Sequence, residues 1–154
     1  MLTYKEYREA KSKSVNELPI FWAFSNEQFK KAMEQRGLTE NDTDKIYKLP
    51  VPGGFYLRKD SEIIRAYFSK EDEILELIKN KKFAYEAFNY EMDNHEYAIN
   101  YYQGDWDVLS CFFDCEWADN KTYVEYLTEC GYADLIDTYE RARKSHFKRA
   151  ENWF

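Results

Sequence analysis

The short segment from Glu91 to Glu96 contains the side chains best suited to chemistry. One imidazole, that of His95, stands beside the carboxylates of Glu91, Asp93 and Glu96. Such a set could bind a divalent metal through Glu91, Asp93 and His95, or perform acid–base catalysis through Glu91, His95 and Glu96. On a helix, Glu91 and His95 would share one face. We favour a structural role for His95, as a helix cap or a partner of a backbone carbonyl, because zinc sites usually contain more His or Cys.

The three cysteines do not form a recognisable metal or disulfide pattern. Cys111 and Cys115 are four residues apart and resemble half a metal site, but no second pair and no nearby His follows them. A chain of this size can build an ordinary core without disulfides, so we expect Cys111, Cys115 and Cys130 to be reduced thiols and the first two to be small core residues. We expect no cofactor.

Other motifs for catalysis are missing. Gly53-Gly54 lacks the Lys-Ser/Thr of a phosphate-binding loop and predicts a turn, and neither G-x-G-x-x-G nor G-x-S-x-G occurs. A catalytic triad would have to use His95 or His146, the two histidines of the chain. The sequence therefore favours a binding role over an enzymatic one.

The charges of the chain are unevenly distributed. Between Phe83 and Asn120 there are nine acidic residues and eleven aromatic ones, and no Lys or Arg. So many rings predict a folded segment with the rings mainly inward and the carboxylates mainly outward, which would create an acidic face. The nine acids are Glu86, Glu91, Asp93, Glu96, Asp105, Asp107, Asp114, Glu116 and Asp119.

An acidic face could steer a basic protein partner toward it and repel nucleic acid. The residues expected to contact the partner are Asp93, Glu96, Asp105, Trp106, Asp107, Asp114, Glu116 and Asp119. Trp106 is the candidate anchor, although an inward Trp106 is an equal alternative. The competing interpretation is an acidic surface that only maintains solubility. Because the last helix is rich in Lys and Arg, a homo-oligomer that pairs acidic and basic poles is also possible.

Length and composition predict one domain over residues 1–154. The net charge of −7 argues against a general nucleic-acid binder. The N-terminus lacks the pattern of a secretory signal, and the longest apolar run, 20–24, is far shorter than a membrane span. We therefore expect a cytoplasmic protein with no membrane partner.

Apolar periodicity and capping residues predict an α+β fold, with about three to four short antiparallel strands packed against several helices and a helical C-terminal part. Thr3 and Ser25 are expected N-caps, and Gly37 and Gly131 are expected to end helices. The expected strands are 20–24, 46–49, 55–58 and 97–101. The expected helices are 3–14, 25–37, 61–68, 69–79, 83–92, 108–113, 122–130 and one from about 132.

Three stretches carry a resemblance to a known family. They are FWAFSNEQF at 21–29, PGGFYLRKD at 52–60 and KKFAYEAFNYEMDNHEY at 81–97. Together they resemble an uncharacterised family of small phage and mobile-element proteins, a likeness that leaves out the tail after Asn120. The resemblance implies a bacterial or phage setting but brings no activity, so no catalytic residue is carried over. The leading hypothesis is a phage-encoded modulator or inhibitor of a basic, nucleic-acid-binding host or defence protein; the alternative is a small metal-dependent hydrolase or nuclease.

Overall fold

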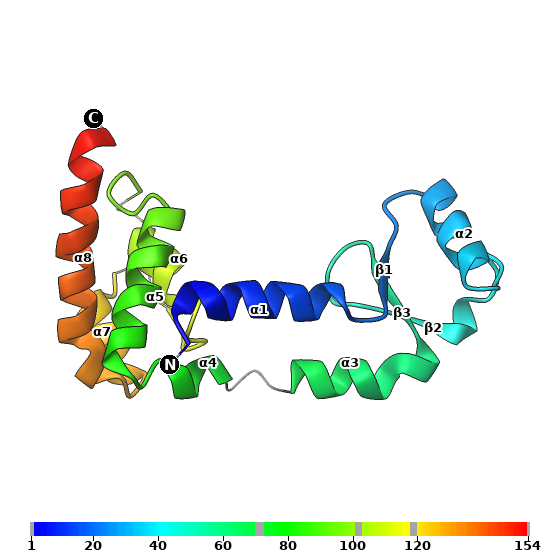
Figure 1. The fold of residues 1–154 in the computed structure, drawn as a ribbon, viewed down its shortest axis with the longest axis horizontal. Coiled ribbons are helices and arrows are strands. Elements are labelled where there is room, and N and C mark those ends of the chain that lie inside the picture. The colour runs from blue at the N-terminus through cyan, green and yellow to red at the C-terminus, as the bar shows by residue number, and fades with distance from the viewer. Residues whose placement is uncertain (1, 70–72, 101–102, 118–119, 154) are drawn as a thin grey trace. The chain divides into compact units, whose positions relative to one another are not determined.

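The computed structural model describes residues 2–69, 73–100, 103–117 and 120–153. Contacts group these residues into two compact units, one formed by residues 1–9 and 71–154 and the other by residues 10–70. We call the first the helical unit and the second the sheet unit. Helix α1 (Tyr4–Asn16) begins in the helical unit and continues into the sheet unit (Figure 1). The expectation of a single domain, made from length and composition, stays a prediction.

The sheet unit contains a three-stranded antiparallel sheet with the order β1-β3-β2. Strands β2 (Ile46–Lys48) and β3 (Gly54–Leu57) form the expected hairpin, and β1 (Ile20–Trp22) pairs with the other edge of β3. The turn before β3 requires a left-handed backbone at Gly53, whose φ is 80°. The strand expected at 20–24 is confirmed but shorter, and its Trp22 faces solvent rather than the core.

Helix α2 (Asn26–Gln35) covers the sheet through β1. Its expected start is confirmed, because the Ser25 side chain accepts a hydrogen bond from the Gln28 backbone N–H at 3.1 Å. Gly37, with φ of 72°, follows the C-cap and ends the helix as expected. The buried core of this unit is small and consists of Phe21, Ala32, Met33 and Ile46.

Short elements complete the sheet unit. They are the 3₁₀ helices η1 (Thr43–Lys45) and η2 (Arg58–Asp60) and helix α3 (Ser61–Phe68). Ser69 was expected to begin the next helix, but it is the C-cap of α3, because its N–H donates to the Arg65 carbonyl at 2.9 Å.

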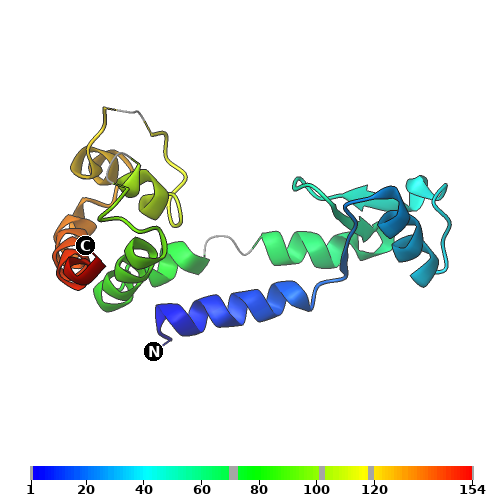
Figure 2. The same ribbon diagram turned by 90° about the horizontal axis from the view of Figure 1, so that it is seen from above.

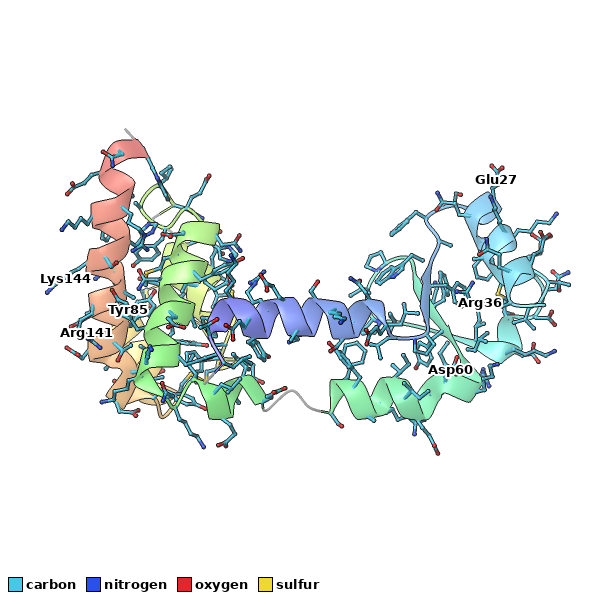
Figure 3. The ribbon with its side chains drawn as sticks, viewed as in Figure 1. Glu27, Arg36, Asp60, Tyr85, Arg141 and Lys144 are labelled. Carbon is cyan, nitrogen blue, oxygen red and sulfur yellow. A yellow bond between two sulfur atoms is a disulfide. The ribbon has the colours of Figure 1, made fainter. Side chains whose placement is uncertain are left out.

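The helical unit is built on the pairing of α5 with α8. The two helices lie side by side in both views (Figures 1 and 2), and their rings meet where Phe88 packs edge-on against Tyr139 at 5.1 Å between centroids. At the surface of this pair, the Arg141 guanidinium of α8 lies 5.6 Å from the Tyr85 ring of α5 (Figure 3). The elements of this unit are α4 (Glu73–Leu77), α5 (Lys81–Asn94), α6 (Gly104–Leu109), α7 (Tyr123–Glu129), η3 (Ala133–Leu135), α8 (Ile136–Ala150) and η4 (Glu151–Trp153).

The strand expected at 97–101 is wrong for its described residues, 97–100, which form a turn after α5. The Tyr97 N–H donates to the Met92 carbonyl at 3.0 Å and the Glu96 N–H to the Asp93 carbonyl at 3.3 Å. These two bonds form a Schellman motif, which caps the helix and buries Tyr97 against the core. The composition of this stretch therefore does not indicate a strand, because Tyr97 is buried in a turn and the β-branched Ile99 is 52% exposed.

The expectation of three reduced cysteines is also corrected. Cys115 and Cys130 form a disulfide, and Cys111 is free. Cys130 is the C-cap of α7, whose start at the Thr122 N-cap and end at Gly131 agree with the sequence. The bond joins the segment before α7 to the end of that helix. The α+β class with a small antiparallel sheet and a helical C-terminal part is confirmed, and no helix in the described ranges has the length and apolar character needed to cross a bilayer.

Candidate functional site

Glu91 is the centre of the candidate site. It lies on the inner face of α5, and only 1% of the residue is exposed. One carboxylate oxygen, Oε1, accepts a hydrogen bond from the Tyr4 hydroxyl at 2.7 Å and forms an ion pair with Arg8. The other oxygen, Oε2, lies 3.2 Å from His95 Nε2 and 3.4 Å from Cys111 Sγ. Each oxygen thus has its own set of partners, which compensates the cost of burying a charge.

The partners of Oε1 come from α1. Burial and the neighbouring Glu91 carboxylate raise the pKa of the Tyr4 hydroxyl well above its ordinary value. The hydroxyl therefore keeps its proton and donates it to the hydrogen bond with Glu91. The Arg8 guanidinium also lies 4.8 Å from the Tyr90 ring centroid, a cation–π contact that helps to fix its position.

His95 and Cys111 complete the cluster on the other side of Glu91. His95 is the C-cap of α5 through its backbone N–H, and its Nε2 atom lies 3.6 Å from Cys111 Sγ. The structural role expected for its side chain stays a prediction. Burial and the Glu91 carboxylate raise the pKa of the Cys111 thiol to about 12. Cys111 is therefore a thiol at neutral pH and a poor nucleophile. The same imidazole nitrogen faces both neighbours, so the three side chains do not form the relay of a catalytic triad.

Asp93 does not join this cluster, although it was expected on the partner-binding face and was a ligand of the alternative metal site. It points to α8, where its Oδ1 lies 2.6 Å from His146 Nδ1 and 2.9 Å from Arg149 Nη2. His146 Nε2 accepts from the Ala98 backbone N–H at 3.0 Å, so the proton is on Nδ1 and is donated to Asp93. Asp93 therefore holds α5 to α8.

The pKa of Asp93 reports this attachment. Its burial favours the neutral acid, but hydrogen bonds from Arg149 and His146 outweigh that effect and lower the pKa below its ordinary value. Because Arg149 already pairs with it, the Asp93 side chain is a stable carboxylate in the folded protein. It is therefore not a free acid for a partner protein.

Asp105 is likewise an internal anchor and not a free surface acid. Its Oδ1 accepts hydrogen bonds from the Tyr97 and Tyr139 hydroxyls, each at 2.6 Å. Arg143 Nε donates to the Tyr97 hydroxyl at 2.9 Å, and this extends the network to α8. Burial and the Asp105 carboxylate raise the pKa of both tyrosines, so both hydroxyls remain donors at neutral pH.

The remaining predicted contact residues are more accessible. Glu96, Asp114 and Glu116 are exposed, and no Lys or Arg in the described ranges forms an ion pair with them. Asp107 Oδ2 accepts a hydrogen bond from Asn100 at 2.9 Å and is also free of a cation among the described residues. Asp119 lies outside the described residues.

Trp106, like Tyr90, is an exposed aromatic residue of the segment from 83 to 120. It is 36% exposed, and its ring centroid lies 5.8 Å from that of Trp117. Trp117 in turn packs against Tyr126 of α7 at 5.1 Å. Trp106 therefore lies at the surface, as the proposed anchor requires, and its ring packs against the partly buried ring of Trp117.

The sequence missed several residues that shape the site. Tyr4 and Arg8 precede Glu91 by more than 80 positions, and Cys111 follows it by 20. No spacing rule connects residues so far apart. Cys111 was paired with Cys115 by proximity in the chain, whereas the structure pairs it with the histidine and glutamate of α5.

Comparisons with known proteins give a family but no activity. A family model described as a family of unknown function (DUF7659) matches residues 3–119. The match includes α1, α5 and α6, which carry the Glu91 cluster, and it ends before α7. No curated protein and no solved structure matches the chain.

Proposed function

The chain belongs to the DUF7659 family of unknown function, and we propose that it is a non-enzymatic interaction protein that binds a basic partner. The observation that carries the proposal is a pair of contacting tryptophans whose neighbours in the chain are acids, and no carboxylate of these acids forms an ion pair within the described ranges. Lys121 contacts Glu116 only through its backbone carbonyl, at 3.5 Å. We call the two tryptophans and these acids the acidic tryptophan patch and define it as Trp106, Asp107, Asp114, Glu116 and Trp117.

The patch combines two features of protein-binding surfaces. Large aromatic side chains near the centre of an interface supply much of its binding energy. Unpaired carboxylates around them attract a basic surface and raise the rate of association. By contrast, Asp93 and Asp105 have their partners inside the chain, so the proposal assigns partner contact to the patch and not to the whole segment from 83 to 120.

Nucleic-acid-binding proteins are the class of partner proposed, because a clustered basic face is their common feature. The net charge of −7 also supports a protein partner over direct binding to phosphates. We propose that this interaction takes place in a bacterial cytoplasm, where the chain would act as a phage or mobile-element modulator or inhibitor of a host or defence protein. That setting rests on the sequence resemblance at 21–29, 52–60 and 81–97.

The proposal is tested by affinity capture from a bacterial lysate with the full chain as bait. We expect one or a few basic, nucleic-acid-binding proteins to be enriched. The double reversal D114K/E116K and the truncation W106A should each weaken the purified complex at least about tenfold, since hot-spot truncations commonly cost 2 kcal/mol or more. Binding of the reversed variant should also depend less on salt.

The matched control is the reversal E27K/E34K on α2, which changes the net charge equally. Both residues are exposed, and Glu27 points away from the sheet unit (Figure 3). The control variant should bind as tightly as the wild type. If the two reversals weaken binding equally, or if no basic protein is enriched, the patch is not a binding site.

A further inference from the structure

A second site, independent of the acidic tryptophan patch, is formed by Glu91, His95 and Cys111. We propose that these three side chains bind a zinc-class metal ion. Their donor atoms, Glu91 Oε2, His95 Nε2 and Cys111 Sγ, converge from α5 and from the turn after α6, with separations of 3.2, 3.4 and 3.6 Å. Among the described residues, no other group of His, Cys, Asp and Glu side chains converges in this way.

The separations fit the coordination geometry of zinc. Zinc binds carboxylate oxygen and imidazole nitrogen at about 2.0–2.2 Å and thiolate sulfur at about 2.3 Å, so tetrahedral ligand atoms lie about 3.4–3.6 Å apart. The three observed separations are within a few tenths of an ångström of these values. An ion therefore requires little movement of the ligands.

The backbone holds the ligands in place. Glu91 and His95 are one helical turn apart on α5, and the His95 N–H donates to the Glu91 carbonyl at 2.9 Å. Cys111 is fixed by the bond from its N–H to the Val108 carbonyl at 3.2 Å, and the following Phe112 is buried in the core. The thiol also donates to the Asp107 carbonyl at 3.2 Å. The site is thus built on two packed elements of one unit.

The surroundings of Glu91 resemble the outer shell of a metal site. Tyr4 and Arg8 hold Oε1 and leave Oε2 directed at His95 and Cys111, while Asn94 Nδ2 lies 3.4 Å from Oε2. Such outer contacts orient ligating carboxylates in metalloproteins. When the ion binds, the Cys111 thiol releases its proton to solvent. The resulting thiolate and the Glu91 carboxylate together balance the two charges of the ion, and Arg8 remains on the far oxygen.

The donor set selects the class of ion. Thiolate and imidazole ligands favour zinc and similar transition metals, whereas calcium and magnesium prefer oxygen ligands. The side chain of His95 is 34% exposed and Cys111 is exposed, so solvent reaches the cluster. A water molecule could therefore provide a fourth ligand.

The test uses the full-length protein, stripped of metal with a chelator, with its disulfide intact and Cys111 unmodified. Cobalt(II) serves as the spectroscopic probe for zinc. We expect one cobalt ion per chain, intense visible bands typical of tetrahedral coordination, and a near-ultraviolet band from charge transfer between thiolate and cobalt. A wild-type spectrum without the thiolate band overturns the proposal, whatever the variants do.

The variants identify the ligands. C111S should abolish the thiolate band, and C111S and H95Q should each weaken cobalt binding at least tenfold, as measured by competition with a chromophoric chelator. The control is E96Q, which alters an exposed acid next to His95 outside the cluster, and it should bind cobalt like the wild type. Equal affinity of C111S and the wild type, or an equal loss in E96Q, overturns the ligand assignment.

Discussion

The two units of the molecule treat polar groups in opposite ways. In the described ranges, the buried polar or charged side chains Glu91, Thr138 and His146 all lie in the helical unit. The buried cluster of the sheet unit contains only apolar residues. Its aromatic side chains extend to the surface, where Phe24 is 72% exposed and stacks on Trp22 at 6.4 Å between ring centroids.

This difference places the residues that could bind a metal or react in the helical unit, and exposed apolar residues that could contact a partner in the sheet unit. A buried ionisable group costs free energy unless it is paired, so the helical unit must specify its partners closely. The sheet unit has no such requirement and can keep apolar area at its surface. One hollow of this unit, of about 660 Å³, is lined by aromatic residues such as Phe24, Phe29 and Phe55 together with several polar side chains. Reactive or metal-binding residues are therefore to be sought in the helical unit.

The strongest test of the contrast removes the cation that accompanies the buried carboxylate. R8M keeps an apolar stem but leaves Glu91 without its ion-pair partner. Because breaking a buried pair leaves an uncompensated charge, we expect a loss of about 3–5 kcal/mol in the stability of the helical unit. Hydrogen exchange of the α5 amides under native conditions measures this loss for the unit itself.

The control for R8M is K5M, which removes an exposed cation from the same helix. Its effect should be within about 0.5 kcal/mol. If R8M lowers the stability of the helical unit no more than K5M does, Arg8 does not stabilise the buried Glu91 carboxylate. The helical unit then does not require a specific partner for this buried charge.

The disulfide is a further device found only in the helical unit. C115S/C130S opens a loop with a sequence separation of 15 residues, which should cost about 3 kcal/mol through the entropy of the unfolded chain. Urea unfolding measures the loss, and alkylation without reductant followed by mass spectrometry should label one cysteine per wild-type chain, Cys111. Labelling of all three would show that the bond does not form and would restore the original expectation of reduced thiols.

Local patterns in the sequence predicted much of the sheet unit and the helix ends. The hairpin around Gly53, the Ser25 cap and the end of α2 at Gly37 all depend on neighbouring residues, and all were predicted correctly. The site was predicted only as far as it is local: Glu91 and His95 share a face of α5 as expected. Their partners Arg8 and Cys111 depend on tertiary packing, for which the sequence gives no periodic signal.

The same limit explains the acidic segment. Counting charges between 83 and 120 correctly located the acids but could not show that Asp93 binds Arg149 of α8 or that Asp105 accepts from two buried tyrosines. Arg149 and Tyr139 lie outside the counted segment, and Tyr97, which lies inside it, acts through a neutral hydroxyl. The absence of Lys and Arg within a segment therefore does not make its carboxylates free.

The contacts of Asp93 with His146 and Arg149, which join α5 to α8, should stabilise the protein less than the Glu91–Arg8 pair does, because the Asp93 side chain is 44% exposed. D93A leaves the buried Nδ1–H of His146 without an acceptor, which should cost about 1–2 kcal/mol at pH 7. The folded protein lowers the pKa of Asp93, so this stabilisation is present above the ordinary pKa of an aspartate and is lost as the pH falls through the lowered value. The stability difference between wild type and D93A should therefore shrink in acid, below about pH 4.

Urea unfolding of both proteins across pH 2–7 measures this difference. The control D137A breaks an exposed pair on α8, in which Asp137 lies 3.3 Å from Arg141 and is 84% exposed. It should change stability by less than about 0.5 kcal/mol and show no comparable dependence on pH. A D93A effect that is constant over this pH range would mean that the charge of Asp93 does not hold the two helices together.

The smallest predicted effect compares the same helix ending in the two units. Both α2 and α5 end in a Schellman motif, but the left-handed position is Gly37 in the first and Glu96, with φ of 52°, in the second. A left-handed backbone is strained for a residue with a Cβ, so E96G should stabilise the helical unit by up to about 1 kcal/mol. G37A should destabilise the sheet unit by a similar amount, since a Cβ at Gly37 would meet no atom within 4 Å and only the backbone strain would act. Thermal unfolding measures the change in melting temperature of each variant. If E96G and G37A shift the melting temperature in the same direction, the residue at the left-handed position does not control how the two helices end.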